Sequence, residues 1–167
     1  REVAIAIAKQ PVGRLATFDL MFEGIRNALK TGIQSAIINA ERQLSDDFAK
    51  RLLKALFLIK YVKGFKATTR NLAVLMLESF GEDIASLRKR IEAALNLLEQ
   101  ETFIQRSGDI YEYLTDDEKD IEKEIKDTEV ETSDVMSELD KLVFDNVIKH
   151  RKIRHDNGQD YPYSRKM

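Results

Sequence analysis

The chain has 167 residues, 43% of them hydrophobic, and no cysteine. This is the composition of a globular protein with enough apolar residues for a core, and it excludes disulfides, a thiolate nucleophile and a cysteine-based zinc site. No apolar run approaches the roughly 20 residues that cross a bilayer, so the sequence predicts a soluble, cytoplasmic protein without a membrane partner. The chain begins with Arg1 rather than Met, which favours a piece of a longer protein.

The net charge of −2 is distributed unevenly. It is +2 over residues 1–44, +1 over 45–114, −9 over 115–146 and +4 over 147–167. Domains that bind nucleic acid strongly are usually more basic than residues 45–114, because neutralising phosphates supplies most of the non-specific affinity. The charge therefore favours a weak or conditional contact with DNA.

Residues 1–44 form the first predicted segment, built around one long helix. Residues 2–9 alternate large and small apolar side chains, a pattern typical of a strand or of the end of a helix. Apolar residues then recur at helical spacing from Leu15 to Glu41. So broad an apolar surface needs a partner, which is either the segment that follows or a neighbouring domain.

Residues 45–114 have the order of a winged helix-turn-helix, which is three helices and then a β-hairpin. The first helix is expected to open at Ser45, and its apolar residues recur three and four apart. They are Phe48, Leu52, Ala55, Leu56 and Ile59. The second helix is expected to start after Thr68 or Thr69, whose hydroxyl can accept from a free backbone N–H.

The third helix, Asp83–Gln100, would be the recognition helix of this motif. Two short β-prone runs follow it, residues 102–106 and 110–114, joined by Ser107-Gly108-Asp109. Glycine at the turn is typical of a hairpin, and this hairpin would be the wing.

Residues 115–167 form the third predicted segment. Thr115-Asp116-Asp117-Glu118 has the pattern of a capping box and predicts a helix to about Asp127 that buries one narrow edge, Ile121 and Ile125. A second helix, Asp134–His150, is expected to be capped by Ser133. Its expected inward face is Met136, Leu139, Leu142, Val143 and Val147.

A second hairpin is expected near the C-terminus, because Asn157-Gly158 is a strong turn signal. The fold class is therefore mainly α with small β-hairpins (α+β). A winged helix-turn-helix is flanked by a long N-terminal helix and by a C-terminal unit of helices and a hairpin.

Catalytic motifs are absent from the sequence. It has neither a phosphate-binding G-x-x-x-x-G-K-[ST] loop nor a G-x-G-x-x-G cluster, and no serine has a nucleophile-elbow pattern. His150 and His155 lie among basic neighbours that disfavour a metal cation, and the acidic run from Asp116 to Glu124 lacks calcium-loop spacing. We expect no catalytic activity, cofactor or metal in this stretch.

Double-stranded DNA is the candidate ligand of the predicted winged helix. The third helix would present Ser86, Lys89, Arg90 and Asn96 on its solvent face, and Arg106 lies near the tip of the wing. Lys60, Lys63, Lys66 and Arg70 form a second basic cluster near the start of the helix-turn-helix. Lysines and arginines are also common on any solvated helix, so a protein-binding or architectural winged helix stays an open alternative.

Several runs of the sequence resemble the large P-loop ATPase of bacterial BREX phage-defence systems, the BrxC/PglY family. Residues 51–68 and 70–75 carry the likeness first, followed by 87–90, 94–100 and 113–121. Asp160-Tyr161-Pro162 and Ser164-Arg165-Lys166 extend it to the C-terminus. None of these runs is a catalytic motif, so the resemblance indicates a family and no active site.

The resemblance implies a large cytoplasmic ATPase whose nucleotide-binding motifs, with ATP and Mg²⁺, lie outside this sequence. This stretch would then be a non-catalytic segment that contacts DNA, another subunit or other BREX components. The alternative is a stand-alone transcription regulator that binds operator DNA as a dimer.

Overall fold

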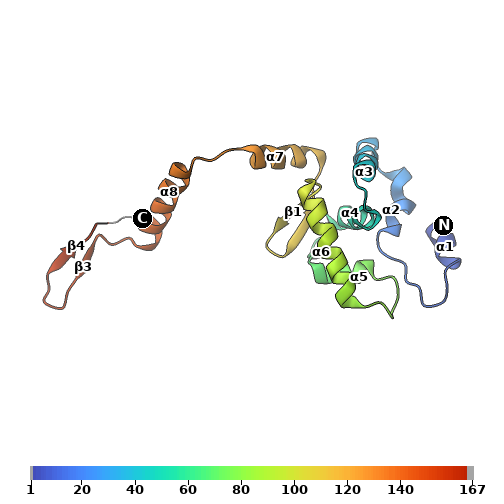
Figure 1. The fold of residues 1–167 in the computed structure, drawn as a ribbon, viewed down its shortest axis with the longest axis horizontal. Coiled ribbons are helices and arrows are strands. Elements are labelled where there is room, and N and C mark those ends of the chain that lie inside the picture. The colour runs from blue at the N-terminus through green and yellow to red at the C-terminus, as the bar shows by residue number, and fades with distance from the viewer. Residues whose placement is uncertain (1, 165–167) are drawn as a thin grey trace. The chain divides into compact units, whose positions relative to one another are not determined.

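The computed structural model describes residues 2–164, except for the side chains of Glu2, Val3 and Ala6 (Figure 1). Arg1 and the closing run Arg165-Lys166-Met167 lie outside the described residues. The chain divides into two compact units, the first ending at Glu124 and the second beginning at Ile125. The described residues are mainly helical with two antiparallel two-stranded sheets, as the sequence predicts.

The first unit begins with three short helices rather than one long one. Residues 2–9, which the sequence left open, form helix α1 (Glu2–Ala8). The predicted helix from Leu15 to Glu41 is wrong, because the chain forms α2 (Leu20–Ile25), a 3₁₀ turn to Ala28 and α3 (Thr31–Gln43).

The break between α2 and α3 lies at Leu29 and Lys30, which are extended, with ψ of 151° and 144°. Thr31 and Gly32 follow it, and both are poor helix formers. The side-chain amide of Gln34 donates to the Leu29 carbonyl at 2.7 Å and secures the start of α3. Because the apolar residues keep helical spacing across this break, the sequence pattern predicts one continuous helix where the structure has two.

Helices α4 (Asp47–Ile59), α5 (Thr69–Met76) and α6 (Ile84–Gln100) follow in the predicted order. The cap of α4 is Asp46 and not Ser45, since the Asp46 carboxylate accepts from the N–H of Phe48 at 2.7 Å. Thr68 caps α5, as expected, and Asp83, the expected first residue of the third helix, is the cap of α6.

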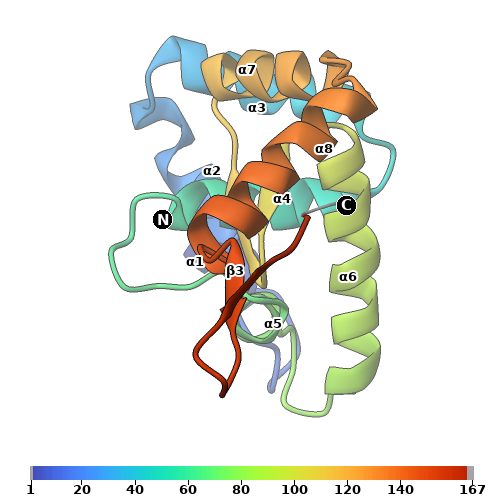
Figure 2. The ribbon, with the colours of Figure 1, turned by 90° about the vertical axis from the view of Figure 1, so that its left-hand side faces the viewer.

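Helix α4 lies among the other elements of the first unit, with α3 and α6 alongside it (Figure 2). Its predicted apolar face is fully buried. Phe22 of α2 and Ile37 of α3 belong to the same core, so the N-terminal segment packs on residues 45–114, which is one of the two alternatives that the sequence left open. The rings of Phe22, Phe57 and Tyr113 meet edge to face with centroids 5.8 and 5.4 Å apart, which joins α2, α4 and the hairpin.

The hairpin consists of β1 (Ile104–Ser107) and β2 (Ile110–Tyr113), with Ser107 opposite Ile110. Gly108 takes a φ of +61° at the turn, a conformation that favours glycine. The N–H of Tyr111 donates to the Ala67 carbonyl at 3.1 Å, which fixes the segment before α5 against the hairpin.

Helix α7 (Asp116–Asp127) begins with the predicted capping box. The N–H of Thr115 donates to the Glu118 carboxylate at 2.7 Å, and the N–H of Glu118 donates to the Thr115 hydroxyl at 3.4 Å. The expected narrow buried edge is not formed, because the side chains of Ile121 and Ile125 are exposed.

The second unit holds α8 (Thr132–Lys141), a π-helical turn (Leu142–Val147) and the strands β3 (Lys152–Arg154) and β4 (Asp160–Pro162). The predicted cap Ser133 lies inside α8, and the helix does not reach His150, because the N–H of Ile148 donates to the Val143 carbonyl and widens the last turn. The face expected to point inward is exposed or half-buried. The hairpin around Asn157-Gly158 is confirmed, with Gly158 at a φ of +83°.

Candidate nucleic-acid interface

The solvent face of α6 is presented by a helix whose other face is deeply buried. Leu87, Ile91, Ala94, Leu95 and Leu98 lie in the core, and the Asp83 carboxylate accepts from the N–H groups of Ala85 and Ser86. Burial on one side and a cap at the start hold α6 rigidly. Its opposite side, where we expected DNA contacts, is exposed.

A groove of about 480 Å³ lies between the start of α5, the exposed face of α6 and the β1–β2 hairpin. Three of the predicted DNA-binding residues line it, namely Arg70 of α5, Asn96 of α6 and Arg106 of β1. Thr68, Thr69 and Tyr111 also line the groove, and Glu92 and Asp109 add two carboxylates. The groove thus combines cations with groups that can donate and accept hydrogen bonds.

Arg106 is held in place at the hairpin tip. Its Nε donates to the Gly108 carbonyl at 2.8 Å, and its guanidinium lies 5.5 Å from the centre of the Tyr111 ring. These contacts leave the side chain exposed and restrict its rotamers, which lowers the entropy that binding an anion costs.

The other predicted residues do not line the groove. Arg90 lies over the ring of Phe48 at 4.0 Å, on the flank of α6 that faces α4. Ser86 and Lys89 are exposed on α6, and Lys63 and Lys66 are exposed in the connection between α4 and α5. Three of the predicted residues therefore line one groove, and the others are spread around it.

Ion pairing divides the cations of the first unit into two groups. The first group pairs with carboxylates: Arg26 in the 3₁₀ turn after α2, Arg51 and Lys54 of α4, and Lys60 directly after α4. Among the described residues, the cations of the groove and its surroundings form no ion pair; these are Lys63, Lys66, Arg70, Lys89 and Arg106. Positive charge that is not neutralised within the protein is available to an anionic ligand.

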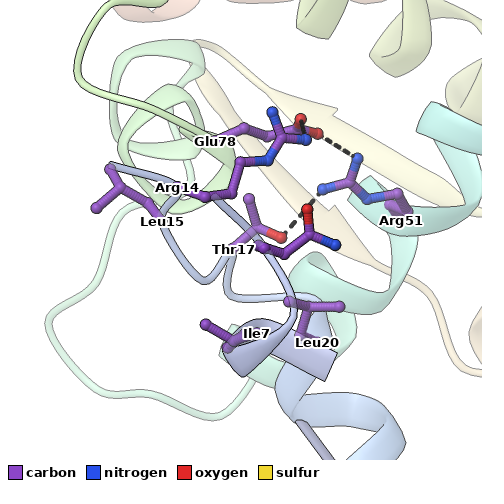
Figure 3. Close-up of a pocket in the computed structure, with 8 residues that line it drawn as sticks. Ile7, Arg14, Leu15, Thr17, Leu20, Arg51 and Glu78 are labelled. Atoms are coloured by element: carbon purple, nitrogen blue, oxygen red, sulfur yellow. Dashed lines mark hydrogen bonds and ion pairs between the residues drawn. The ribbon is translucent and has the colours of Figure 1, made fainter. Parts of the chain in front are cut away.

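The loop between α5 and α6 is fixed by a charged cluster that the sequence did not reveal (Figure 3). Arg51 of α4 donates to Glu78 at 2.5 Å, to Asp19 at 2.9 Å and to the Thr17 hydroxyl at 3.0 Å. Arg14 pairs with the same Glu78, and the N–H of Leu15 donates to the Glu78 carbonyl at 2.7 Å. The segment before α2 and the loop before α6 are thereby joined.

Electrostatics in this cluster favour the charged forms. The hydrogen bond from Arg51 is the main cause that lowers the pKa of the Glu78 carboxyl. Burial alone would lower the pKa of Arg51, but the hydrogen bonds that Arg51 donates to Asp19 and Glu78 outweigh it and raise the pKa. The cluster is a structural clamp. Arg14, Thr17, Arg51 and Glu78 line a cavity of about 200 Å³ together with apolar side chains that include Ile7 and Leu20 (Figure 3).

The described residues contain no group of three or more His, Asp or Glu side chains placed to hold a metal ion. The backbone N–H of Asn157 donates to Nδ1 of His155 at 3.3 Å, within the turn of the second hairpin. Among the described residues, no helix is both long enough and apolar enough to span a membrane.

One protein family matches part of the chain. Residues 128–167 match the family described as the fourth domain of the BREX ATP-binding protein BrxC, with a six-stranded β-sheet. The resemblance to BREX ATPases that the sequence suggests is confirmed over these residues. No solved structure matches the chain significantly.

Proposed function

We propose that this chain is a segment of a BrxC-like ATP-binding protein of a BREX phage-defence system in the bacterial cytoplasm. The similarity of residues 128–167 to a BrxC domain supports this assignment. ATP and Mg²⁺ would bind elsewhere in the longer protein, and this segment would be non-catalytic.

Within that protein, residues 45–114 act as a winged helix-turn-helix that contacts double-stranded DNA. The observation that carries this proposal is the groove that Arg70, Asn96 and Arg106 line together, in which neither arginine forms an ion pair among the described residues. Arg70 and Arg106 would contact phosphates, which position the protein, and Asn96 would reach base edges from α6. The two carboxylates in the groove, Glu92 and Asp109, keep the contact weak.

The mechanism is positional. Because the Arg51 clamp joins α4 to both the segment before α2 and the loop before α6, DNA bound at α6 fixes the orientation of the N-terminal helices. An attached ATPase core would then be oriented on DNA by these rigid contacts.

Protein contact is the second candidate function, favoured by a separate apolar groove of about 320 Å³. Leu29, Ile33, Phe57, Tyr61 and Tyr113 line this groove, at the junction of α3, α4 and β2. Another BREX component or a second subunit could bury these side chains. The two functions use different surfaces, so they can be separated by substitution.

Fluorescence anisotropy with a labelled random-sequence duplex tests the DNA contact. We expect binding at low salt, and we expect the Arg70→Ala/Arg106→Ala variant to bind about tenfold more weakly, with a salt slope smaller by about 2 because two phosphate contacts are lost. The matched control is Lys30→Ala/Arg42→Ala, which removes the same charge from exposed positions on or beside α3, away from the groove.

Equal affinities of the two double variants for the duplex would show that DNA binds at a surface other than this groove. Absence of binding by the wild-type chain at low salt would contradict the DNA proposal and leave protein contact as the function. A stand-alone regulator predicts in addition a stable dimer and tight binding of one sequence, so a monomer in analytical ultracentrifugation would argue against it.

A further inference from the structure

The second unit buries none of its described side chains. Every described residue from 125 to 164 is exposed or half-buried. A ten-residue helix and a two-stranded hairpin are each marginally stable alone in water, and about 40 residues rarely bury a sufficient core. The unit therefore needs additional structure to stabilise it.

The β3–β4 hairpin has an apolar face and a polar face. Ile153 lies opposite Tyr161, and the His155 ring lies 6.2 Å from the Tyr161 ring on the same face. Lys152, Arg154 and Asp160 lie on the other face. This alternation is typical of strands that cover a core on one side.

The hydrogen bonds of the hairpin show which backbone groups are free. The N–H of His155 donates to the Gln159 carbonyl at 3.0 Å, and the N–H of Tyr163 donates to the Arg151 carbonyl at 3.4 Å. In an antiparallel pair, alternate residues bond inward. The backbone groups of Lys152 and Arg154 on β3, and of Asp160 and Pro162 on β4, therefore point away from the partner strand.

The two outer edges of this hairpin are not equivalent. The edge of β3 offers both an N–H and a carbonyl at each of its outward positions, Lys152 and Arg154. The edge of β4 lacks one donor, because Pro162 occupies an outward position and has no N–H. Proline in a sheet is confined to edge strands, so β4 is suited to the edge and β3 to the interior.

We propose that β3 pairs along its free edge with a further β-strand of the same protein, leaving β4 as the edge strand of a larger sheet. The matched family domain has a six-stranded sheet, and this hairpin supplies two strands. The other strands in the described residues, β1 and β2, pair with each other in the first unit. The additional strands therefore come from sequence outside residues 2–164.

The larger sheet also provides a surface for α8. Met136, Leu139 and Leu142 are 44%, 39% and 50% exposed along one stripe of α8 and the turn after it. A sheet that extends the Ile153–Tyr161 face would bury this stripe, as helices cover the apolar faces of sheets. This inference rests on the proposed membership of a BrxC-like protein and is independent of DNA binding.

Hydrogen exchange with single-residue resolution tests the pairing, comparing this 167-residue chain with the longer protein. In the chain alone, the amides of Lys152, Arg154 and Asp160 should all exchange fast. In the longer protein, the amides of Lys152 and Arg154 should exchange at least roughly tenfold more slowly, while that of Asp160 stays fast.

Proline substitutions at one cross-strand pair provide a matched control. Arg154→Pro removes an outward donor from β3, and Asp160→Pro removes the opposite outward donor from β4. In the longer protein, Arg154→Pro should abolish the protection of residues 150–155 and Asp160→Pro should preserve it. Neither variant should alter DNA binding, so failure of the strand pairing and failure of the DNA proposal give different results.

Protection of Asp160 instead of Arg154, or equal effects of the two prolines, would overturn the proposed edge. Protection of Arg154 that develops in the 167-residue chain as its concentration rises would show that a second copy supplies the strand. That result would overturn pairing within one protein.

Discussion

Arg51 links three segments of the chain through one guanidinium. Its partner Asp19 has a side chain only 5% exposed, so removing the cation leaves a buried carboxylate without its charge partner. We predict that Arg51→Met lowers the free energy of unfolding by about 2–3 kcal/mol, measured by urea denaturation.

Lys50→Ala is the control for this prediction. Lys50 pairs at 2.8 Å with Asp47, whose side chain is 90% exposed, and pairs of that kind contribute little. An Arg51→Met variant as stable as Lys50→Ala would show that the clamp does not stabilise the fold.

Glu78 makes part of this stability depend on pH. Arg51 lowers the pKa of the Glu78 carboxyl below its usual 4.5, so the charged form stabilises the fold at neutral pH and the contribution is lost as pH falls through the lowered pKa. Glu78→Gln should therefore melt at a lower temperature than the wild type at pH 7, and the gap should shrink toward pH 3. A gap that is unchanged over this range in circular dichroism melts would contradict the assignment.

Residue-level prediction from the sequence is informative about exposure. Arg70, Asn96 and Arg106 are exposed, as their positions in the sequence predict, and the structure brings them to one groove, while their contact with DNA stays a prediction. Arg90 was selected by the same rule, but its packing on Phe48 depends on tertiary structure. The Arg51 clamp could not be found because Glu78 and Thr17 lie 27 and 34 residues away, with no local pattern to connect them.

Elements were predicted well when their ends carry local signals. Thr68, Asp83 and the Thr115-Glu118 box begin their helices as expected, and Gly108 and Gly158 form the two hairpin turns. The prediction of one helix from Leu15 to Glu41 is wrong, because apolar periodicity does not detect two extended residues such as Leu29 and Lys30. The expected inward face of α8 is exposed or half-buried, because apolar spacing identifies one face of a helix but not a surface that covers it.

The start of α4 can be tested with neighbouring substitutions. Asp46→Ala removes the carboxylate that caps the helix and should cost about 1 kcal/mol of stability. Ser45→Ala should be nearly neutral, because its exposed side chain makes no capping hydrogen bond. Equal losses in thermal denaturation would contradict the assignment of Asp46 as the cap.

At the scale of the whole molecule, the two units differ in how they are stabilised. The first unit has a continuous core from α2 to β2, whereas none of the described residues from 125 to 164 is buried. Limited proteolysis should therefore cut first within residues 125–164 and leave residues 2–124 resistant, as mass spectrometry of the fragments would show. Early cleavage inside α4 or α6 would contradict a stable first unit.

The DNA contact is the central claim, and an NMR titration of the ¹⁵N-labelled chain with a short DNA duplex tests it most directly. Binding in the groove predicts chemical-shift changes concentrated at Arg70, Asn96 and Arg106, with none at Leu29 or Ile33 of the apolar groove. Unchanged spectra at low salt, or changes that avoid all three groove residues, would contradict a nucleic-acid interface on α6 and the β1–β2 hairpin.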